Sequence, residues 1–330
     1  MITGKYPSLR LRRTRKYSWS RRIVKESNLS ASDLIYPIFL IEGKSRKKPI
    51  KSMPGVYRYT IDHLDKIVRN VIKKKIPMIA LFPTTPKNKK DKNGTEALNE
   101  NNLVCKAIRF IKKKFNNNVG IMCDVALDPY TTHGHDGLVK NNYVINDQTI
   151  KILVKQSLLQ AEMGCDVLAP SDMMDGRIGE IRNSLDKNKF HDVQILSYAV
   201  KYASNFYGPF RDAVGSNKLL KSDKKSYQMD FSNSNESLRE VKLDIKEGAD
   251  MVIVKPGMPY LDIIKKVKEN FKIPVLAYQV SGEYSLIKNG IKNKLIDEDA
   301  IIESLMCLKR AGASAIISYF ALDVAKKLRN

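Results

Sequence analysis

The sequence contains no apolar run of the roughly 20 residues that a membrane-spanning helix needs, and no apolar signal-peptide core near its start. Cysteine is scarce. The four cysteines are scattered and share no spacing typical of a metal site: Cys105, Cys123, Cys165 and Cys307. They are interpreted as buried thiols in a reducing compartment. These absences predict a cytoplasmic, globular protein with no membrane partner and no cysteine-based metal centre.

Acidic residues are also few relative to basic ones. The 330 residues include 58 Lys and Arg but only 35 Asp and Glu, which gives a formal net charge of +23. Such a charge is typical of a protein that binds a polyanion, or of a lysine-rich solvated surface. No RNA- or DNA-binding motif accompanies the charge, so we expect no nucleic-acid partner. A small anionic substrate would be attracted by the same field.

The first 34 residues differ from the rest of the chain. No acidic residue precedes Glu26, and the stretch RLRRTRKYSWSRR is densely basic. A transit peptide has a similar composition, and so does an extended arm that packs on a neighbouring subunit. The composition alone leaves both interpretations open.

Eight short apolar runs follow this segment, and each is typical of a buried parallel strand. They cover residues 34–41, 78–83, 119–127, 166–171, 193–200, 251–255, 274–280 and 314–320. Helical periodicity lies between them, over residues 59–75, 96–115, 147–164, 235–248 and 260–271. Gly164, Gly248 and Gly312 each stand between a helical stretch and a strand, as expected for a glycine just beyond a helix C-terminus.

Eight strands alternating with helices predict an α/β fold, a (β/α)8 barrel over residues 35–330 preceded by an arm over residues 1–34. An open doubly wound sheet is the alternative. It usually has a glycine-rich phosphate turn after its first strand, and the stretch FLIEGKSRKKP has none.

Polar residues stand where several of these strands end, which is where barrel enzymes carry their catalytic groups. Lys201 ends ILSYAVK and Lys255 ends MVIVK. A charged lysine inside a barrel is costly unless it is paired or deprotonated. Burial and a second nearby cation both lower the pKa of a lysine, and a neutral lysine forms Schiff bases with carbonyl compounds. Two lysines at the same depth favour this chemistry over two solvated strand ends.

The stretch DVALDPYTTHGHDG, residues 124–137, concentrates three aspartates and two histidines. It is compatible with a metal site, a catalytic site or a polar loop. His133 and His135 are separated by a single glycine at a turn of the chain, which favours loop-stabilising hydrogen bonds over metal ligation.

The chain resembles the porphobilinogen synthase (5-aminolevulinate dehydratase) family from the arm to Tyr319. The resemblance rests on LIYPIFLIEG, MPGVYRY, DVALDPYTTHGHDG, APSDMMDGRIG, SYAVKYASNFYGPFRDA, SYQMD, EGADMVIVKPGMPYLDI and AYQVSGEY. It implies a (β/α)8 barrel and a lyase of tetrapyrrole biosynthesis. The family condenses two molecules of 5-aminolevulinate into porphobilinogen with loss of two waters.

The resemblance also implies roles for single residues. Lys255 would bind the first (P-side) substrate as a Schiff base, and Lys201 would bind or assist the second (A-side) substrate. Ser281 and Tyr319 would hold the P-side carboxylate. The A-side carboxylate would be held by Arg211, Lys224 and Gln228, which lie in a basic segment, residues 211–228, expected to act as a lid. Ser171 is a further expected substrate-binding residue.

The expected metal content follows from the same resemblance. The zinc-dependent branch of the family has cysteines where this sequence has Ala126, Asp128 and Asp136. Carboxylates favour magnesium over zinc, so the chain resembles the aspartate-rich, zinc-independent branch, and no catalytic zinc is expected. Asp124, Asp128 and Asp136 are expected to be catalytic, by steering protons or the substrate ammonium, or to bind a hard cation.

Two further expectations concern assembly. Glu240 matches the carboxylate that binds an allosteric magnesium in this branch. The basic arm matches the family's octamer contacts, which favours an interface arm over a targeting peptide. The alternative enzyme is another class I barrel aldolase, which needs only one Schiff-base lysine and no serine–tyrosine clamp. A non-enzymatic alternative is a basic nucleic-acid-binding protein, whose affinity for nucleic acid would fall steeply with salt concentration.

Overall fold

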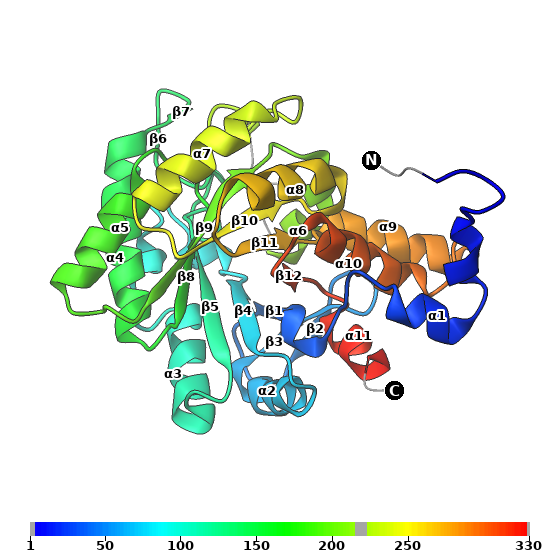
Figure 1. The fold of residues 1–330 in the computed structure, drawn as a ribbon. Coiled ribbons are helices and arrows are strands. Elements are labelled where there is room, and N and C mark those ends of the chain that lie inside the picture. The colour runs from blue at the N-terminus through cyan, green and yellow to red at the C-terminus, as the bar shows by residue number, and fades with distance from the viewer. Residues whose placement is uncertain (1–3, 215–222, 329–330) are drawn as a thin grey trace.

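The computed structural model describes residues 4–214 and 223–328. Eight parallel strands form a closed barrel (Figure 1). They are β1 (Leu34–Leu40), β4 (Met78–Pro83), β5 (Gly120–Val125), β8 (Val167–Pro170), β9 (Gln194–Lys201), β10 (Met251–Lys255), β11 (Val275–Tyr278) and β12 (Ala315–Ile317). Each pairs with the next, and β12 closes the ring on β1 through Leu34 and Ile316. All eight predicted strands and the predicted (β/α)8 barrel are confirmed.

Helices surround the barrel, as a parallel sheet requires on its outer face. They are α2 (Leu64–Lys73), α3 (Leu103–Phe115), α4 (Asn146–Glu162), α5 (Arg177–Lys187), α7 (Asn235–Lys246), α8 (Leu261–Asn270), α10 (Ala300–Ala311) and α11 (Ala321–Lys327). Two further helices, α6 (Gly208–Ala213) and α9 (Ser281–Lys292), begin close behind strand ends. The helical periodicity of the sequence predicted α2, α3, α4, α7 and α8.

The three glycines expected after helices adopt the left-handed backbone that such positions require. Their φ angles are +99° at Gly164, +103° at Gly248 and +114° at Gly312. Since a residue with a β-carbon is strained in this region, these glycines end α4, α7 and α10 sharply. Each helix can then turn directly into the next strand.

The core explains why the strands have almost no polar residues. All four residues of β8 and all four of β11 are buried, and β9 is buried from Ile195 to Lys201. Burial of one Val, Leu or Ile side chain stabilises a fold by about 1.5–3 kcal/mol. The polar residues Lys201 and Lys255 are therefore exceptions that need partners.

Two small hairpins were not predicted from the sequence. Strands β2 (Lys47–Pro49) and β3 (Tyr57–Tyr59) pair antiparallel, and β3 also adds to the end of β1. Strands β6 (Val139–Lys140) and β7 (Tyr143–Val144) form the second hairpin. Strands of two or three residues are too short to give a readable alternation of apolar and polar residues.

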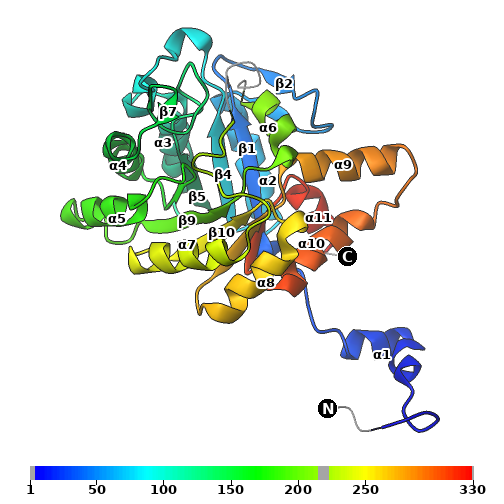
Figure 2. The same cartoon turned by 90° about the horizontal axis from the view of Figure 1, so that it is seen from above.

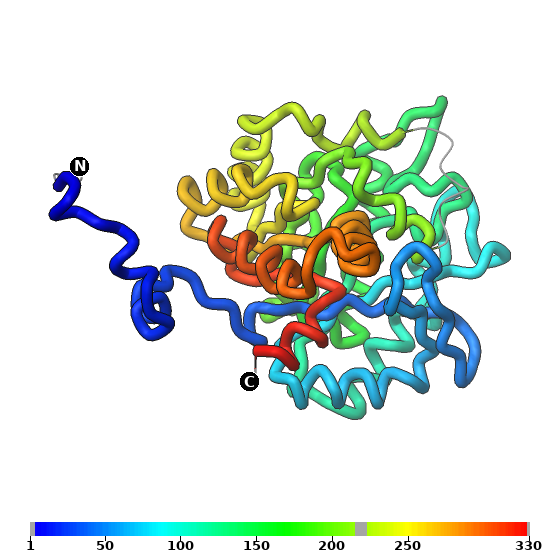
Figure 3. The backbone as a smooth tube through the Cα atoms, turned by 90° about the vertical axis from the view of Figure 1, so that its right-hand side faces the viewer, coloured from blue at the N-terminus to red at the C-terminus, as the bar shows by residue number. Residues whose placement is uncertain are grey.

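The N-terminal segment extends away from the barrel (Figures 2 and 3). Of the predicted arm, residues 1–3 lie outside the described residues. The rest includes a short 3-10 helix (Leu11–Arg15) and α1 (Ser18–Ile23), which expose the large side chains of Tyr17, Trp19 and Ile23. Contact with the barrel begins shortly before β1, where Leu29 is buried and Asp33 pairs with Lys309 at 3.0 Å. Within residues 4–214 and 223–328, no helix is long and apolar enough to cross a membrane.

Candidate active site

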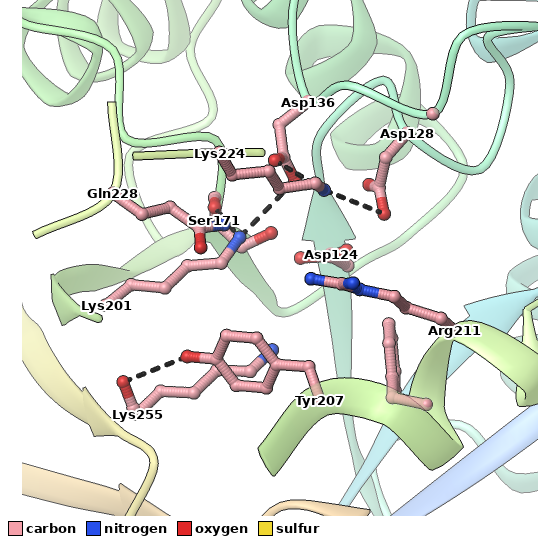
Figure 4. A pocket seen from close by; sticks show the side chains of 12 residues that line it. Asp124, Asp128, Asp136, Ser171, Lys201, Tyr207, Arg211, Lys224, Gln228 and Lys255 are labelled. Carbon is pink, nitrogen blue, oxygen red and sulfur yellow. Dashed lines mark hydrogen bonds and ion pairs between the residues drawn. The ribbon is translucent and has the colours of Figure 1, made fainter. Parts of the chain in front are cut away.

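The carboxyl ends of four neighbouring strands meet in one pocket (Figure 4). Asp124 comes from β5, Ser171 follows β8, Lys201 ends β9 and Lys255 ends β10. The loop after β5 adds Asp128 and Asp136, and the segment after β9 adds Arg211, Lys224 and Gln228.

Nine of the twelve predicted site residues line this pocket. The predicted residues that line the pocket are Asp124, Asp128, Asp136, Ser171, Lys201, Arg211, Lys224, Gln228 and Lys255. Ser281, Tyr319 and Glu240 lie outside its lining.

Lys255 sits among aromatic rings. Its Nζ lies 4.8 Å from the ring centre of Tyr278, 5.1 Å from those of Tyr198 and Phe210, and 5.4 Å from that of Tyr207. Burial, and then the neighbouring charge of Lys201, lower the pKa of Lys255 from its usual 10.5 to about 7. A large fraction of this amine is therefore neutral, and nucleophilic, near neutral pH.

Lys201 has polar surroundings instead. It is the direct partner of Lys255 in the pairing of β9 with β10. Its Nζ donates to the backbone oxygen of Ser171 and lies 3.4 Å from Oδ1 of Asp136. Adjacent strands thus place two lysines side by side, one in an apolar environment and one in an ion pair.

The three aspartates differ in pKa because their partners differ. Burial, and then the charge of Asp128, raise the pKa of Asp124 to about 6. Burial also raises the pKa of Asp128. Burial alone would raise the pKa of Asp136 too, but Lys201 and Lys224 outweigh it and lower the value. Lys224 Nζ lies 2.8 Å from Asp136 and 3.8 Å from Asp128.

The two histidines of this loop make hydrogen bonds that stabilise it. Nε2 of His133 lies 3.1 Å from the backbone oxygen of Lys92, and Nδ1 of His135 lies 3.1 Å from the hydroxyl of Tyr227. In the part of the chain that the structure describes, no group of three His, Cys, Asp or Glu residues is arranged to hold a metal ion. The contacts agree with the interpretation of these histidines as loop residues.

The segment predicted to form a lid is described only in part, since residues 215–222 lie outside the described residues. Its first part is α6, which is held from two sides. Arg58 Nε donates to the backbone oxygen of Ala213 at 2.6 Å, and the backbone N–H of Phe210 donates to Oγ of Ser281 at 2.8 Å. Arg211 lines the pocket from this helix.

Ser281 and Tyr319 do not line the pocket but contact residues that surround Lys255. Ser281 is reached through Phe210, whose N–H it accepts. The hydroxyl of Tyr319 lies 2.9 Å from that of Tyr278, whose ring faces Lys255. Both residues are buried, so they adjoin the Lys255 side of the pocket without lining it.

Comparison with known proteins agrees with this geometry. The family model described as delta-aminolevulinic acid dehydratase matches residues 8–327. A protein of that name from Bradyrhizobium diazoefficiens is 55% identical over 98% of this chain and 91% of its own length. One from Methanothermus sociabilis is 50% identical over 98% of this chain and all of its own length.

The chain belongs to the delta-aminolevulinic acid dehydratase family. The crystal structure of the family member from Toxoplasma gondii, in complex with the reaction product porphobilinogen, superposes with a TM-score of 0.94. It is 44% identical, and the match covers 97% of this chain and 91% of that one. The predicted family and activity are confirmed: the protein is a lyase, a 5-aminolevulinate dehydratase, and not a class I aldolase of another family.

Within this dehydratase, the aromatic wall around Lys255 was not predicted from the sequence. From spacing alone, ordinary core residues would be expected at Tyr198, Tyr207, Phe210 and Tyr278. Three of them flank Lys201 in the stretch SYAVKYASNFYGPF. This clustering of aromatics beside a strand-end lysine was the available signal.

Glu240 lies apart from the dehydratase pocket, on α7. It borders a separate recess together with Glu236, Asp175 and the side chain of Asn146. Burial, and then the charge of Asp244, raise the pKa of Glu240. The negative charges near Glu240 form a place where a cation would be stabilised.

Proposed function

We propose that this dehydratase joins its two 5-aminolevulinate molecules through imines formed on Lys255 and then on Lys201. The observation that supports the proposal best is the pairing of two buried lysines at the ends of β9 and β10, with the pKa of Lys255 lowered to about 7. A neutral amine and a ketone are the two reactants that a Schiff base requires.

Lys255 is the first nucleophile in this proposal. Its neutral Nζ attacks the ketone carbon of the P-side substrate, and loss of water leaves an imine. Asp124 lies close enough to affect the pKa of Lys255, and its own pKa of about 6 allows it to release and recover a proton near neutral pH. The protonated imine withdraws electrons and acidifies the neighbouring carbon for bond formation.

Lys201 has a different task because it is ion-paired with Asp136. It binds the A-side substrate, or assists it, after the first imine has formed.

The substrate carboxylates need cationic or hydroxyl partners. For the A-side carboxylate we assign Arg211, Lys224 and Gln228, which line the same pocket as the two lysines (Figure 4). Lys224 now pairs with Asp136 and Asp128, so it would exchange one carboxylate for another. For the P-side carboxylate we assign Ser281 and Tyr319, and the backbone oxygen of Ser171 keeps Lys201 in place.

The metal assignment follows the chemistry of the donors. Asp128 and Asp136 are hard ligands already paired with Lys224, and no thiolate lines this pocket among the described residues. We therefore propose an enzyme of the zinc-independent branch. The carboxylates beside Glu240 suit magnesium, which would retain much of its water shell there because no three-residue cage is present within the described residues. Bound there, magnesium supplies a positive charge that favours one assembly of subunits.

The assembly and location are also proposals. The exposed Tyr17, Trp19 and Ile23 of the arm support docking on a neighbouring copy, and an octamer and a cytoplasmic location remain predictions. Nothing in the described residues calls for a nucleic-acid or membrane partner.

The test is reductive trapping with 5-aminolevulinate and borohydride, followed by peptide mass spectrometry. We expect Lys255 to be labelled, and Lys201 to be labelled as well when the enzyme is turning over. Lys255→Ala should abolish turnover while the fold is retained, and Lys272→Ala on the surface serves as the control. Labelling confined to other lysines would overturn the assignment.

A further inference from the structure

Glu283 is a buried carboxylate that none of the roles above uses. It lies in the first turn of α9, and only 3% of its surface is exposed. Three backbone N–H groups donate to it: Val280 at 2.6 Å, Met258 at 2.5 Å and Gly257 at 3.4 Å. Both carboxylate oxygens are used as acceptors.

One of these bonds has an ordinary explanation. A glutamate at the third position of a helix commonly accepts from the residue that caps the helix, and Val280 is that residue here. The bonds from Gly257 and Met258 have no such explanation, because they come from the loop after β10. Glu283 therefore joins two strand ends.

The two joined segments carry residues of the proposed P-side half-site. Gly257 and Met258 are the second and third residues after Lys255, and Val280 directly precedes Ser281. One carboxylate thus bridges the backbone that carries the amine and the backbone that carries a carboxylate-binding hydroxyl.

The junction is closely packed. A β-carbon on Gly257 would lie 3.2 Å from the backbone oxygen of Tyr278, and one on Gly282 would lie 2.4 Å from that of Phe206. Backbone segments following β9, β10 and β11 therefore touch here. A small change in the bridge is transmitted to them because close-packed segments have no free space to absorb it.

We propose that Glu283 is a positioning residue, which sets the distance between Lys255 and Ser281 so that one substrate meets both together. The inference rests on the proposed function, which gives Lys255 and Ser281 their roles. A misplacement of about 1 Å can cost about a hundredfold in rate.

Glu283→Gln tests the bridge with almost no change in shape. An amide offers one acceptor oxygen, and its NH2 group would face a backbone N–H. Burial raises the pKa of Glu283 to about 7, so the assay is run above that pH, where the carboxylate is ionised. The matched control is Glu247→Gln, since Glu247 also accepts a backbone N–H, that of Gly179 at 3.1 Å, but lies outside the pocket lining.

The readout is the ratio of Lys255 to Lys201 labelling by reductive trapping, together with kcat, KM and the thermal unfolding midpoint. For Glu283→Gln we expect Lys255 labelling to slow by about tenfold to a hundredfold, while Lys201 labelling changes little. Glu247→Gln should keep the ratio of the unaltered enzyme. An unchanged ratio in folded Glu283→Gln would overturn the inference.

If Glu283→Gln does not fold, hydrogen exchange of the unaltered enzyme tests the bridge made by Glu283 instead. The amides of Gly257, Met258 and Val280 should be protected together and more strongly once the substrate imine is trapped. Exchange of Gly257 and Met258 at the rate of open loop amides would refute the bridge. Labelling of neither lysine in the unaltered enzyme would instead contradict the proposed function, and this inference with it.

Discussion

The lowered pKa of Lys255 gives a prediction whose sign and size both follow from the structure. The difference between its usual 10.5 and about 7 corresponds to about 5 kcal/mol favouring the neutral amine. Burial is the largest cause and the charge of Lys201 the second, whereas Asp124 acts in the opposite direction. Replacement of either neighbour should therefore move the pKa, and the two replacements should move it in opposite directions.

The size of the effect can be worked out from Coulomb's law. Two charges about 6 Å apart in a medium with an effective dielectric constant of about 20 interact by about 3 kcal/mol, or about two pKa units. Asp136 offsets part of the Lys201 charge, so Lys201→Gln should raise the pKa of Lys255 by about one unit. The neutral fraction at pH 7 would then fall from about one half to about one tenth.

The assay is the pH dependence of Lys255 trapping by cyanoborohydride in the presence of 5-aminolevulinate. Lys201→Gln should move the midpoint upward and Asp124→Asn should move it downward. Lys112→Gln is the control, because Lys112 is ion-paired with Asp166 at 2.6 Å and lies outside the pocket lining. A midpoint that stays fixed in both variants, or a downward movement in Lys201→Gln, would refute the electrostatic coupling of the two lysines.

Further predictions concern stability, assembly and metal. Between about pH 7 and 10.5 the unfolded chain holds a proton on Lys255 and the folded chain does not, so the free energy of unfolding decreases as pH falls through this range. Lys255→Met should therefore stabilise the fold more at pH 6 than at pH 10, as measured by denaturant unfolding. Equal stabilisation at the two pH values would contradict this. Deletion of residues 1–24 should give a smaller assembly on a sizing column, and an unchanged size would count against the interface arm. Magnesium should raise activity partly, and Glu240→Ala should lose that response but keep basal turnover; a full response in Glu240→Ala would move the ion elsewhere. A zinc-selective chelator should change activity little, and inactivation reversed by zinc would refute the zinc-independent assignment.

Local sequence determined the barrel. Strands buried on both faces must be almost wholly apolar, so MVIVK and its seven counterparts are visible without a structure. Gly164, Gly248 and Gly312 are similarly readable, because a left-handed turn strongly favours glycine. Helices α5 and α9 were not predicted, since RIGEIRNSLDK and SGEYSLIKNGIK contain glycine and serine and present a less regular apolar face.

The pocket was only partly determined by sequence. A lysine at the end of an apolar strand is visible, and the family resemblance suggested its partners. The ion pair of Lys201 with Asp136, the contact of Lys255 with the ring of Tyr278 and the hydrogen bond from Met258 to Glu283 join residues 65, 23 and 25 positions apart. Their distances depend on strand register and loop packing. A polar residue at the end of a strand is visible in the local sequence because the buried strand before it must be apolar. The pKa of that residue depends on neighbours that only the closed barrel brings together.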